Sequence, residues 1–344
     1  MAYYDWLFDT LGLRGWCDAE KSDGPMTMEQ LLAQSSGQQI AAEPWWRAPF
    51  PSLDELHESC HAIIRTRDFT EGVEAAFLGI KDSLKFVLDP LTQPLSWLLD
   101  GTLEAFTVTP WWVVIPLLLL LVFRVSRSPA ITLFVAISFM LLALIDHYSY
   151  AIQTLSIIFV CTALCVAIGV PIGITMAKYD GFRRINIPIL DMLQTLPSFV
   201  YLIPLIFLFS VTESKLYGIA IILYAIVPVV RLTDLGIRLV DRDVIEAADA
   251  FGMSPAQKLF NVEIPLALPN IMAGVNQTIM MSLAMVVIAS LVSAPGLGVL
   301  VLRGIRNLEL GVGLIAGFGI VLLAVMLDRV SKASLARINA AQQH

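Results

Sequence analysis

From residue 110 onward, apolar residues occur in long stretches, with polar residues largely confined to the segments between them. A helix needs roughly 17–25 mostly apolar residues to cross a bilayer. We therefore predict seven membrane-spanning helices, at 110–123, 129–146, 152–177, 188–211, 216–231, 268–293 and 309–328. This pattern predicts an all-α, polytopic membrane protein.

Before residue 110 the pattern changes to amphipathic segments separated by polar ones. Apolar residues recur at helical spacing in 53–64 and again in 71–89, which predicts a partly helical tail. Trp45, Trp46 and Trp97 stand beside apolar residues and would suit a bilayer interface. The alternative is a small helical surface that packs on the membrane domain of the same chain.

Composition and charge support this division. The chain is 57% hydrophobic and 15% charged, with a mean hydropathy of +0.75, which is typical of a polytopic membrane protein and not of a soluble domain. Residues 1–109 hold 17 acidic and 7 basic residues, a net charge of −10, whereas the remainder is +3. We read no signal peptide at the N-terminus. The boundary is expected near Pro110.

Basic residues follow alternate predicted spans and predict the orientation of the chain. They are Arg124, Arg127, Lys178, Arg183, Arg184, Arg231, Arg238, Arg242, Arg329, Lys332 and Arg337. The positive-inside rule puts these segments in the cytoplasm, and Arg303 and Arg306 are the one conflict. An odd number of spans then leaves the acidic tail (1–109) outside. The permease domain (110–331) and the short tail 332–344 end in the cytoplasm.

The long loop 232–267 carries signals for a short helix that ends at a glycine. Asp243 is the expected N-cap, and Glu246, three residues on, would complete a capping box with it. Gly252 is expected to end this helix in the left-handed conformation, which glycine adopts without steric cost. This loop is predicted to lie in the cytoplasm.

A second short helix is expected directly after the glycine. Ser254 would cap it, with Pro255 at the first helical position and Gln257 as the capping-box partner. Pro265 is expected to end this helix. The loop is therefore predicted to be two short helices that meet at Gly252.

The spacing of this loop resembles the signature loop of ABC-importer permeases. The residues that carry the resemblance are Glu246, Ala247, Ala248, Gly252, Val262, Ile264 and Pro265, with aliphatic replacements at two positions. The resemblance implies that the loop docks into a cleft on a separate ATPase subunit. The alternative is an ordinary amphipathic surface helix that contains Glu-Ala-Ala.

A second resemblance covers about 145–330. The runs 191–204, 231–238 and 272–290, extended by Leu302-Arg303-Gly304-Ile305 and Leu327-Asp328-Arg329, resemble the glycine betaine/proline betaine branch of these permeases. It implies osmoprotectant or quaternary-amine uptake by a type I importer in a bacterial inner membrane. Choline, carnitine or histidine import is the alternative within the class, and a secondary transporter or a membrane receptor are the alternatives outside it.

The same resemblance implies the partners of the chain. They are two copies of a P-loop ATPase, a periplasmic or extracellular substrate-binding protein, membrane lipid and a second copy of the chain in a homodimer. No nucleic acid is expected to bind. ATP would be used by the partner, because the chain has no Gly-x-x-x-x-Gly-Lys-Ser/Thr motif, and we expect no cofactor, catalytic site or metal site in the chain itself.

Two predicted spans hold the candidate residues of a translocation path. Pro197 and Pro204 should interrupt the span 188–211, which would free backbone carbonyls to line a cavity, with Tyr201 between them; a simple kinked helix is the alternative. The other candidates are Asn276, Gln277 and Thr278. Gly274, Thr278 and Ser282 also form a stripe of small residues, for which close helix packing is the expected role.

Single ionisable and sulfur-containing residues complete the picture. Asp191 is placed near the cytoplasmic interface, where a solvated or hydrogen-bonded structural role is expected. Cys161 and Cys165 are expected to be small buried hydrophobes. Cys17 and Cys60 could pair if the tail lies outside the cytoplasm, and the sequence leaves that open.

Overall fold

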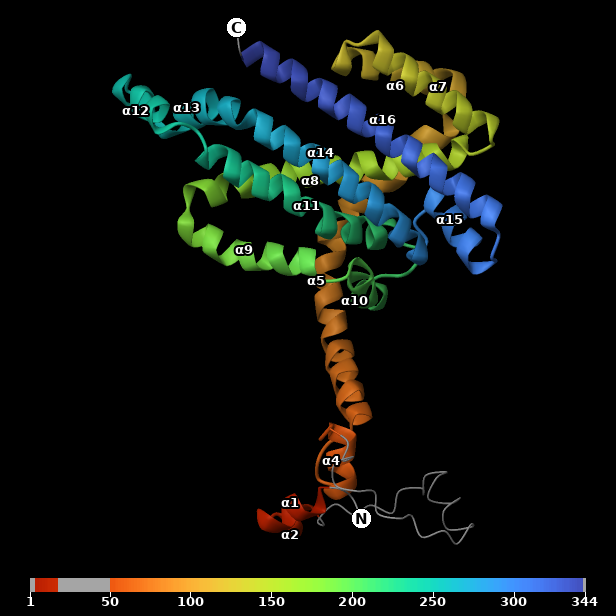
Figure 1. The fold of residues 1–344 in the computed structure, drawn as a ribbon, viewed down its shortest axis with the longest axis vertical. Helices are drawn as coiled ribbons and strands as arrows, with labels where there is room; N and C mark the ends of the chain where they lie inside the picture. Colours follow the sequence, from red (N-terminus) through yellow and green to blue (C-terminus); the bar gives the residue numbers. More distant parts are fainter. Residues whose placement is uncertain (1–3, 18–49, 343–344) are drawn as a thin grey trace. The chain divides into compact units, whose positions relative to one another are not determined.

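The computed structural model describes residues 4–17 and 50–342, and over these residues the chain is helical throughout its regular elements. It forms two compact units, Met1–Leu84 and Lys85–His344 (Figure 1). Each unit is described separately below. The expected interfacial residues Trp45 and Trp46 lie outside the described residues.

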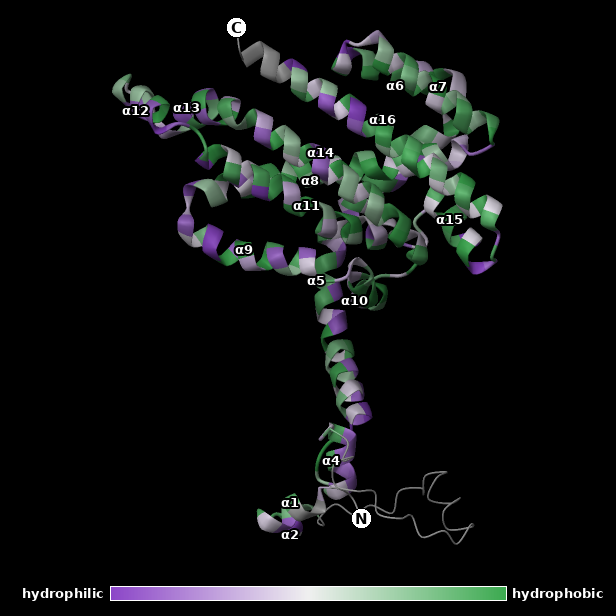
Figure 2. Ribbon diagram, in the orientation of Figure 1, coloured by the Kyte–Doolittle hydropathy of each residue, from purple (hydrophilic) through white to green (hydrophobic). Residues whose placement is uncertain are grey.

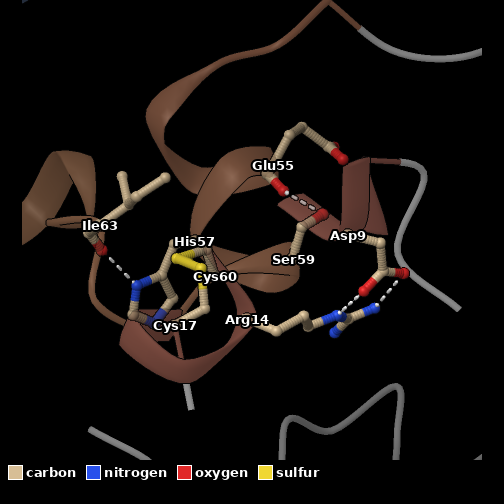
Figure 3. The surroundings of a disulfide bond; sticks show 8 residues. All are labelled: Asp9, Arg14, Cys17, Glu55, His57, Ser59, Cys60 and Ile63. Carbon is tan, nitrogen blue, oxygen red and sulfur yellow. Dashed lines mark hydrogen bonds and ion pairs between the residues drawn. A yellow bond between two sulfur atoms is a disulfide. The ribbon is translucent and has the colours of Figure 1, made fainter. Parts of the chain in front are cut away.

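In the described part of the first unit there are three short helices, α1 (Asp5–Thr10), α2 (Arg14–Cys17) and α4 (Leu53–Ser59). A disulfide between Cys17, at the end of α2, and Cys60, directly after α4, joins two of them (Figure 3). The pairing that the sequence left open is therefore present. Both cysteines are buried with Phe8, in a small cluster completed by Tyr4, Leu56, Ala62 and Ile63. A disulfide is the usual support for a unit with so small an apolar core.

The helix α5 (Thr66–Val108) begins in the first unit and ends in the second. Asp54 accepts a hydrogen bond from the backbone N–H of Thr66 at 2.8 Å, which lowers the pKa of the Asp54 carboxyl below its ordinary value. Within the second unit, α5 packs through Leu99 on Gly218. The two compact units divide at Leu84, and the boundary expected near Pro110 between acidic tail and membrane domain stays a prediction.

The second unit continues through a series of longer helices joined by short turns. They are α6 (Trp111–Ser126), α7 (Pro129–Leu144), α8 (Tyr148–Lys178), α9 (Asp180–Thr195), η2 (Ser198–Tyr201), α10 (Leu202–Leu208), α11 (Ser214–Arg238), α12 (Arg242–Ala250), α13 (Pro255–Lys258), η3 (Leu259–Glu263), α14 (Ile264–Ala289), η4 (Ser290–Val292), α15 (Leu297–Arg306) and α16 (Leu310–Gln342). In Figure 1, α12 and α13 lie at one end of α11 and α14, and α15 lies at the other.

Helices α8, α11 and α14 pack closely because small residues lie at their crossings. A Cβ atom at Gly173 of α8 would lie 2.7 Å from the carbonyl oxygen of Val230 on α11. A Cβ atom at Gly274 of α14 would lie 3.0 Å from the Cα atom of Val229. Thr278 and Ser282 are fully buried on the same face of α14. The packing role predicted for this stripe is confirmed.

Among the described residues, four helices are individually long and apolar enough to cross a membrane: Tyr148–Lys178, Ser214–Arg238, Pro255–Val292 and Leu310–Arg337. Two further spans are possible as bent pairs, α5 with α6 and α9 with η2–α10, and α7 is a shorter apolar helix. Figure 2 shows apolar residues along most of this unit. The structure thus has up to six spans by this measure and α7 besides, where the sequence predicted about seven.

The predicted span 188–211 is not one continuous helix. Its first part belongs to α9, which begins at Asp180, and the chain then bends by 105° before α10. Pro197 lies at this bend, as expected of a helix breaker, whereas Pro204 lies in the first turn of α10, where proline is tolerated. Only one of the two prolines therefore breaks the helix.

Candidate functional site

Helix α12 is the first part of the loop that resembles the permease signature. Its N-cap is Asp241, whose carboxylate accepts a hydrogen bond from the backbone N–H of Asp243 at 3.1 Å. The prediction that Asp243 caps this helix is wrong, because an equally suitable aspartate two residues earlier takes the position. Glu246 then lies too far along the helix to complete a capping box, and its side chain is exposed.

The end of α12 is formed as predicted. Gly252 has φ +74°, in the left-handed region. The backbone N–H of Gly252 donates to the carbonyl of Asp249 at 2.9 Å, and that of Met253 donates to the carbonyl of Ala248 at 3.2 Å. These two bonds are the Schellman arrangement that commonly ends a helix at glycine. A Cβ atom at Gly252 would meet no atom within 4 Å, so only the backbone conformation restricts this position.

Helix α13 follows directly, with the predicted cap. The Ser254 hydroxyl accepts from the backbone N–H of Gln257 at 3.4 Å, and the Gln257 side chain accepts from the backbone N–H of Ser254 at 2.9 Å. Lys258 then reaches back to the carboxylate of Asp249 on α12, at 2.7 and 2.9 Å. The capping box begins the second short helix, and the ion pair joins it to the first.

The second helix of the loop does not end at Pro265, and that prediction is wrong. From Pro255 the chain stays helical to Val292, through the π-helical turn η3 and then α14. The backbone N–H of Ile264 donates to the carbonyl of Leu259, five residues back. Pro265 follows this shift of hydrogen-bond register in the first turn of α14, where a missing N–H is tolerated. The loop is therefore continuous with a spanning helix.

The outer surface of the loop is partly apolar. Ala248 is buried, whereas Glu246 and Ala247 are exposed. Two aromatic side chains that sequence reasoning did not select, Phe251 and Phe260, are 85% and 66% exposed. Large apolar residues within an otherwise polar loop were the signal that could have identified them, because exposed patches of this kind commonly mark a protein contact. Val262 and Ile264 are half-buried and lie on the continuing helix.

Beneath the loop, charged side chains join three helices. Arg238 of α11 contacts Asp234 at 2.8 Å, Asp180 of α9 at 2.7 Å and the carbonyl of Met176 on α8 at 2.8 Å. Asp234 also accepts from Arg183 at 2.9 Å. We call Asp180, Arg183, Asp234 and Arg238 the polar network. Sequence reasoning missed it, since its members are far apart along the chain.

The bend between α9 and α10 holds Tyr201 in place. Its side chain is buried, and its hydroxyl donates to the carbonyl of Leu193 on α9. Pro197 and Pro204 are both exposed. Asp191, near the same bend, pairs with Arg231, as expected of a structural hydrogen-bonded residue. Tyr201 therefore satisfies a carbonyl close to the helix break.

The three neighbouring candidates on α14 point in different directions. Asn276 donates to the carboxylate of Asp328 on α16 at 3.3 Å, Thr278 is fully buried, and Gln277 is exposed. Successive helical positions differ by about 100°, so these three side chains cannot share one face. The structure does not bring them together as a single lining, and of the three Gln277 is the one on an open face.

Sulfur and metal chemistry adds nothing to this site. Cys161 and Cys165 are free and buried in the helical unit, as predicted. Among the residues that the structure describes, no group of three or more His, Cys, Asp or Glu side chains could hold a metal ion. The site therefore consists of the exposed loop, its charged base and the helices that continue from it.

A helical membrane unit with an exposed helix–glycine–helix loop, continuous with a spanning helix, is the construction of the membrane subunit of an ABC importer. The chain belongs to the family of binding-protein-dependent transport system inner membrane components, whose sequence profile matches residues 169–340. The family predicted from the loop and the flanking runs is thus confirmed. Membership implies a substrate-binding protein and an ATPase as partners, and a multi-pass location in the inner membrane.

Individual relatives agree with this assignment. The chain is 38% identical to the glycine betaine/proline betaine transport system permease protein ProW of Escherichia coli, over 83% of this chain and 78% of that one. It is 39% identical to the glycine betaine transport system permease protein OpuAB of Bacillus subtilis, over 74% and 86%. An inward-facing structure of the MetNI methionine ABC transporter matches with a TM-score of 0.50 at 19% identity, covering 56% of this chain and 95% of that one, which confirms the fold.

Proposed function

We propose that this permease moves glycine betaine, proline betaine or a closely related quaternary amine into the cell, after delivery by a binding protein. The observation that carries the proposal is the 38% identity, over 83% of the chain, to a permease named for glycine betaine and proline betaine. Choline, carnitine and histidine are the other substrates that a permease of this construction could serve. The binding protein would make the main choice among them.

Energy would come from ATP bound and hydrolysed by a separate subunit. The segment from α12 to η3 is the element that we assign to its cleft, because it is exposed, carries Phe251 and Phe260 on its surface and continues into α14. Glu246 is exposed and caps nothing, so we assign it to contact with the ATPase. Residues Glu246 to Gly252 and Val262 to Pro265 thus form the coupling element.

The proposed assembly is a homodimer that carries two ATPase subunits. Each chain offers one docking loop, and symmetric oligomers most often have a two-fold axis. The basic segments would face the cytoplasm, which leaves the first unit outside. The Cys17–Cys60 disulfide supports this orientation, since disulfides persist mainly in oxidising compartments.

Gln277 is our candidate for the translocation path. It is exposed near the middle of α14, where an amide facing lipid would lose hydrogen bonds at a cost of roughly 2–7 kcal/mol. A face toward the second copy or toward a hydrated path avoids that cost. The bend at Pro197, where Tyr201 is hydrogen-bonded, would form the other side of the path. Asn276, Thr278 and Pro204 would position the lining residues without facing the path themselves.

Uptake in proteoliposomes tests the substrate. The chain is reconstituted with its ATPase and binding protein, and entry of labelled glycine betaine is followed with ATP inside the cytoplasmic compartment. We expect ATP-dependent uptake that excess unlabelled proline betaine suppresses and excess histidine does not. Uptake of labelled choline or carnitine in preference to both betaines would overturn the substrate assignment while leaving the transporter class intact.

A further inference from the structure

Glu263 is a nearly fully buried carboxylate at the base of the docking loop. It is the last residue of the π-helical turn η3 and the N-cap position of α14, and it is 2% exposed. Its carboxylate pairs with the ammonium group of Lys178, the last residue of α8. We call Lys178 and Glu263 the loop-base pair. A charge this deeply buried needs its partner, because desolvation is otherwise uncompensated.

Apolar residues adjoin both members of the pair. Ala177 precedes Lys178 on α8, and Ile264 follows Glu263 on α14. Both belong to one apolar cluster, whose members are Val170, Ile174, Ala177, Ile237, Ile264, Ala267 and Ile271. The carboxylate of Glu263 is enclosed, whereas the side chain of Lys178 is 34% exposed, so the pair lies at the edge of this cluster, where it interacts more strongly than a pair in bulk water. The pair ties η3 to the end of α8.

The polar network extends this connection to two more helices. Arg238 of α11 holds the carbonyl of Met176, two residues before Lys178, and also Asp180 at the start of α9. The end of α8 is thus held on one side by α11 and on the other by η3. A displacement of the loop can reach the core helices by two routes, through the backbone of α14 and through the loop-base pair.

The π-helical turn η3 is the reason why the loop-base pair is needed in addition to the backbone of α14. Its hydrogen bonds run from residue i to i+5, a register that is rare and usually confined to single turns at functional sites. Such a turn is a point where a helix can change register or direction. Because the turn separates α13 from α14, the backbone alone transmits a movement of α13 incompletely, whereas Glu263 at its end fixes the turn to α8.

We propose that Lys178 and Glu263 are positioning residues that couple the docking loop to α8, so that ATPase movement produces transport. This inference rests on the proposed docking of the loop to the ATPase. The pair touches neither substrate nor nucleotide. Its role is to keep α8 and η3 moving together when α13 moves.

The test measures substrate uptake and ATP hydrolysis together, on the purified complex in proteoliposomes. In Glu263→Gln and Lys178→Met, we expect ATP hydrolysis to continue while uptake per ATP falls by at least about fivefold, the lower end of typical coupling between sites. Lys178→Arg keeps the charge and should keep the wild-type ratio. A wild-type ratio in either single variant, with normal assembly, would overturn the proposal.

The double variant Lys178→Met/Glu263→Gln separates positioning from mere stability. Removing both charges relieves the buried carboxylate that Lys178→Met leaves without a partner, so the melting temperature should recover relative to that single variant. Uptake per ATP should stay low, because the connection is still absent. Recovery of both quantities would show a purely structural pair and overturn the proposal.

A matched control lies at the other end of α11. Asp89→Asn weakens another buried lysine–carboxylate pair, that of Lys215, and should lower stability without changing uptake per ATP. Gly252→Asp tests docking itself. If Gly252→Asp transports normally, the proposed docking fails. If Gly252→Asp is inactive while Glu263→Gln stays fully coupled, only the role of the loop-base pair fails.

Discussion

The two ends of α11 hold their charges in different ways. At the first end, Lys215 is 4% exposed and contacts Asp89 and Glu213 at 2.7 Å each, with the ring of Phe209 5.1 Å from its ammonium nitrogen. At the other end, Asp234 is equally buried and accepts from Arg183 and Arg238, but Arg238 also contacts Asp180, whose side chain is 80% exposed. Each end thus holds one buried charge between partly exposed partners, and only the second end extends to an exposed pair, which exchanges with water at little cost.

This difference separates a fixed end from an adjustable one. Near Lys215, Leu99 of α5 packs on Gly218, and a Cβ atom there would lie 2.6 Å from a methyl group of Leu99. Near Asp234 the packing is also close, since a Cβ atom at Gly236 would lie 2.8 Å from the Cβ atom of Asn270, but ion pairs there extend to the solvent edge. We infer that a signal from the docking loop is received at the adjustable end, while the Lys215 end anchors α5 to the core.

The largest expected effect is at the adjustable end. Gly252→Asp replaces a glycine at positive φ by a residue that adopts this conformation less readily, at about 1 kcal/mol, and adds a negative charge to the docking surface. We expect normal membrane insertion but loss of both uptake and substrate-stimulated ATP hydrolysis. Both are measured on reconstituted complex at equal permease content.

Gly252→Asn is the matched control for that variant, because asparagine tolerates the left-handed conformation and carries no charge. It should retain much of the transport activity. Near-wild-type transport by Gly252→Asp, at normal expression, would show that the loop has no role in coupling. It would also contradict the inference that the adjustable end receives a signal from the loop.

At the fixed end, a substitution should change stability and not coupling. Lys215→Met leaves Asp89 and Glu213 without their shared cation, and because their side chains are 34% and 31% exposed, the cost should be below the ~3–5 kcal/mol typical of a fully buried pair. We expect a clearly lower melting temperature and unchanged uptake per ATP. Arg67→Ala, which breaks an exposed pair with Glu71, should have almost no effect on either. A changed uptake per ATP in Lys215→Met would show that both ends of α11 take part in coupling, which contradicts the proposed difference between them.

The smallest effect on transport is expected in the first unit. Cys17→Ser removes the disulfide, which should destabilise that unit by about 2–4 kcal/mol but leave uptake unchanged. After reduction of the wild-type chain, an impermeant thiol reagent should label Cys17 and Cys60 in intact spheroplasts. Cys161 and Cys165 are buried and serve as internal controls. Labelling that requires an opened membrane would reverse the proposed orientation.

Local signals were sufficient for much of the docking loop. Gly252 and the Ser254 capping box depend on neighbouring residues only, and both were predicted correctly. The N-cap was misplaced because Asp241 and Asp243 are equally good caps by type, and only the helix start decides between them. Pro265 was misread because a proline in a first helical turn and a proline after a helix end look alike in sequence.

Contacts between distant residues could not be predicted in the same way. Lys178 and Glu263 are separated along the chain by the helices from α9 to α13, and nothing near either one indicates its partner. The start of α9 at Asp180 was missed because Arg183 and Arg184 are typical of a cytoplasmic loop, although the helix is amphipathic and packs through Leu190. The path residues Asn276, Gln277 and Thr278 were grouped by sequence proximity, which a helix distributes around its axis.

The chain is helical without a break from Pro255 to Val292, so the number of residues in the loop determines the direction in which α13 faces. Adding or removing one residue between Ser254 and Pro265 would rotate α13 by about 100° about the axis of α14 and shift it by about 1.5 Å. A change placed between Lys258 and Glu263 would turn all of α13, with its Ser254 cap, away from its present direction, whatever residue is added. We therefore expect the loop to tolerate a change of residue type between Gly252 and Pro265 better than a change in the number of residues.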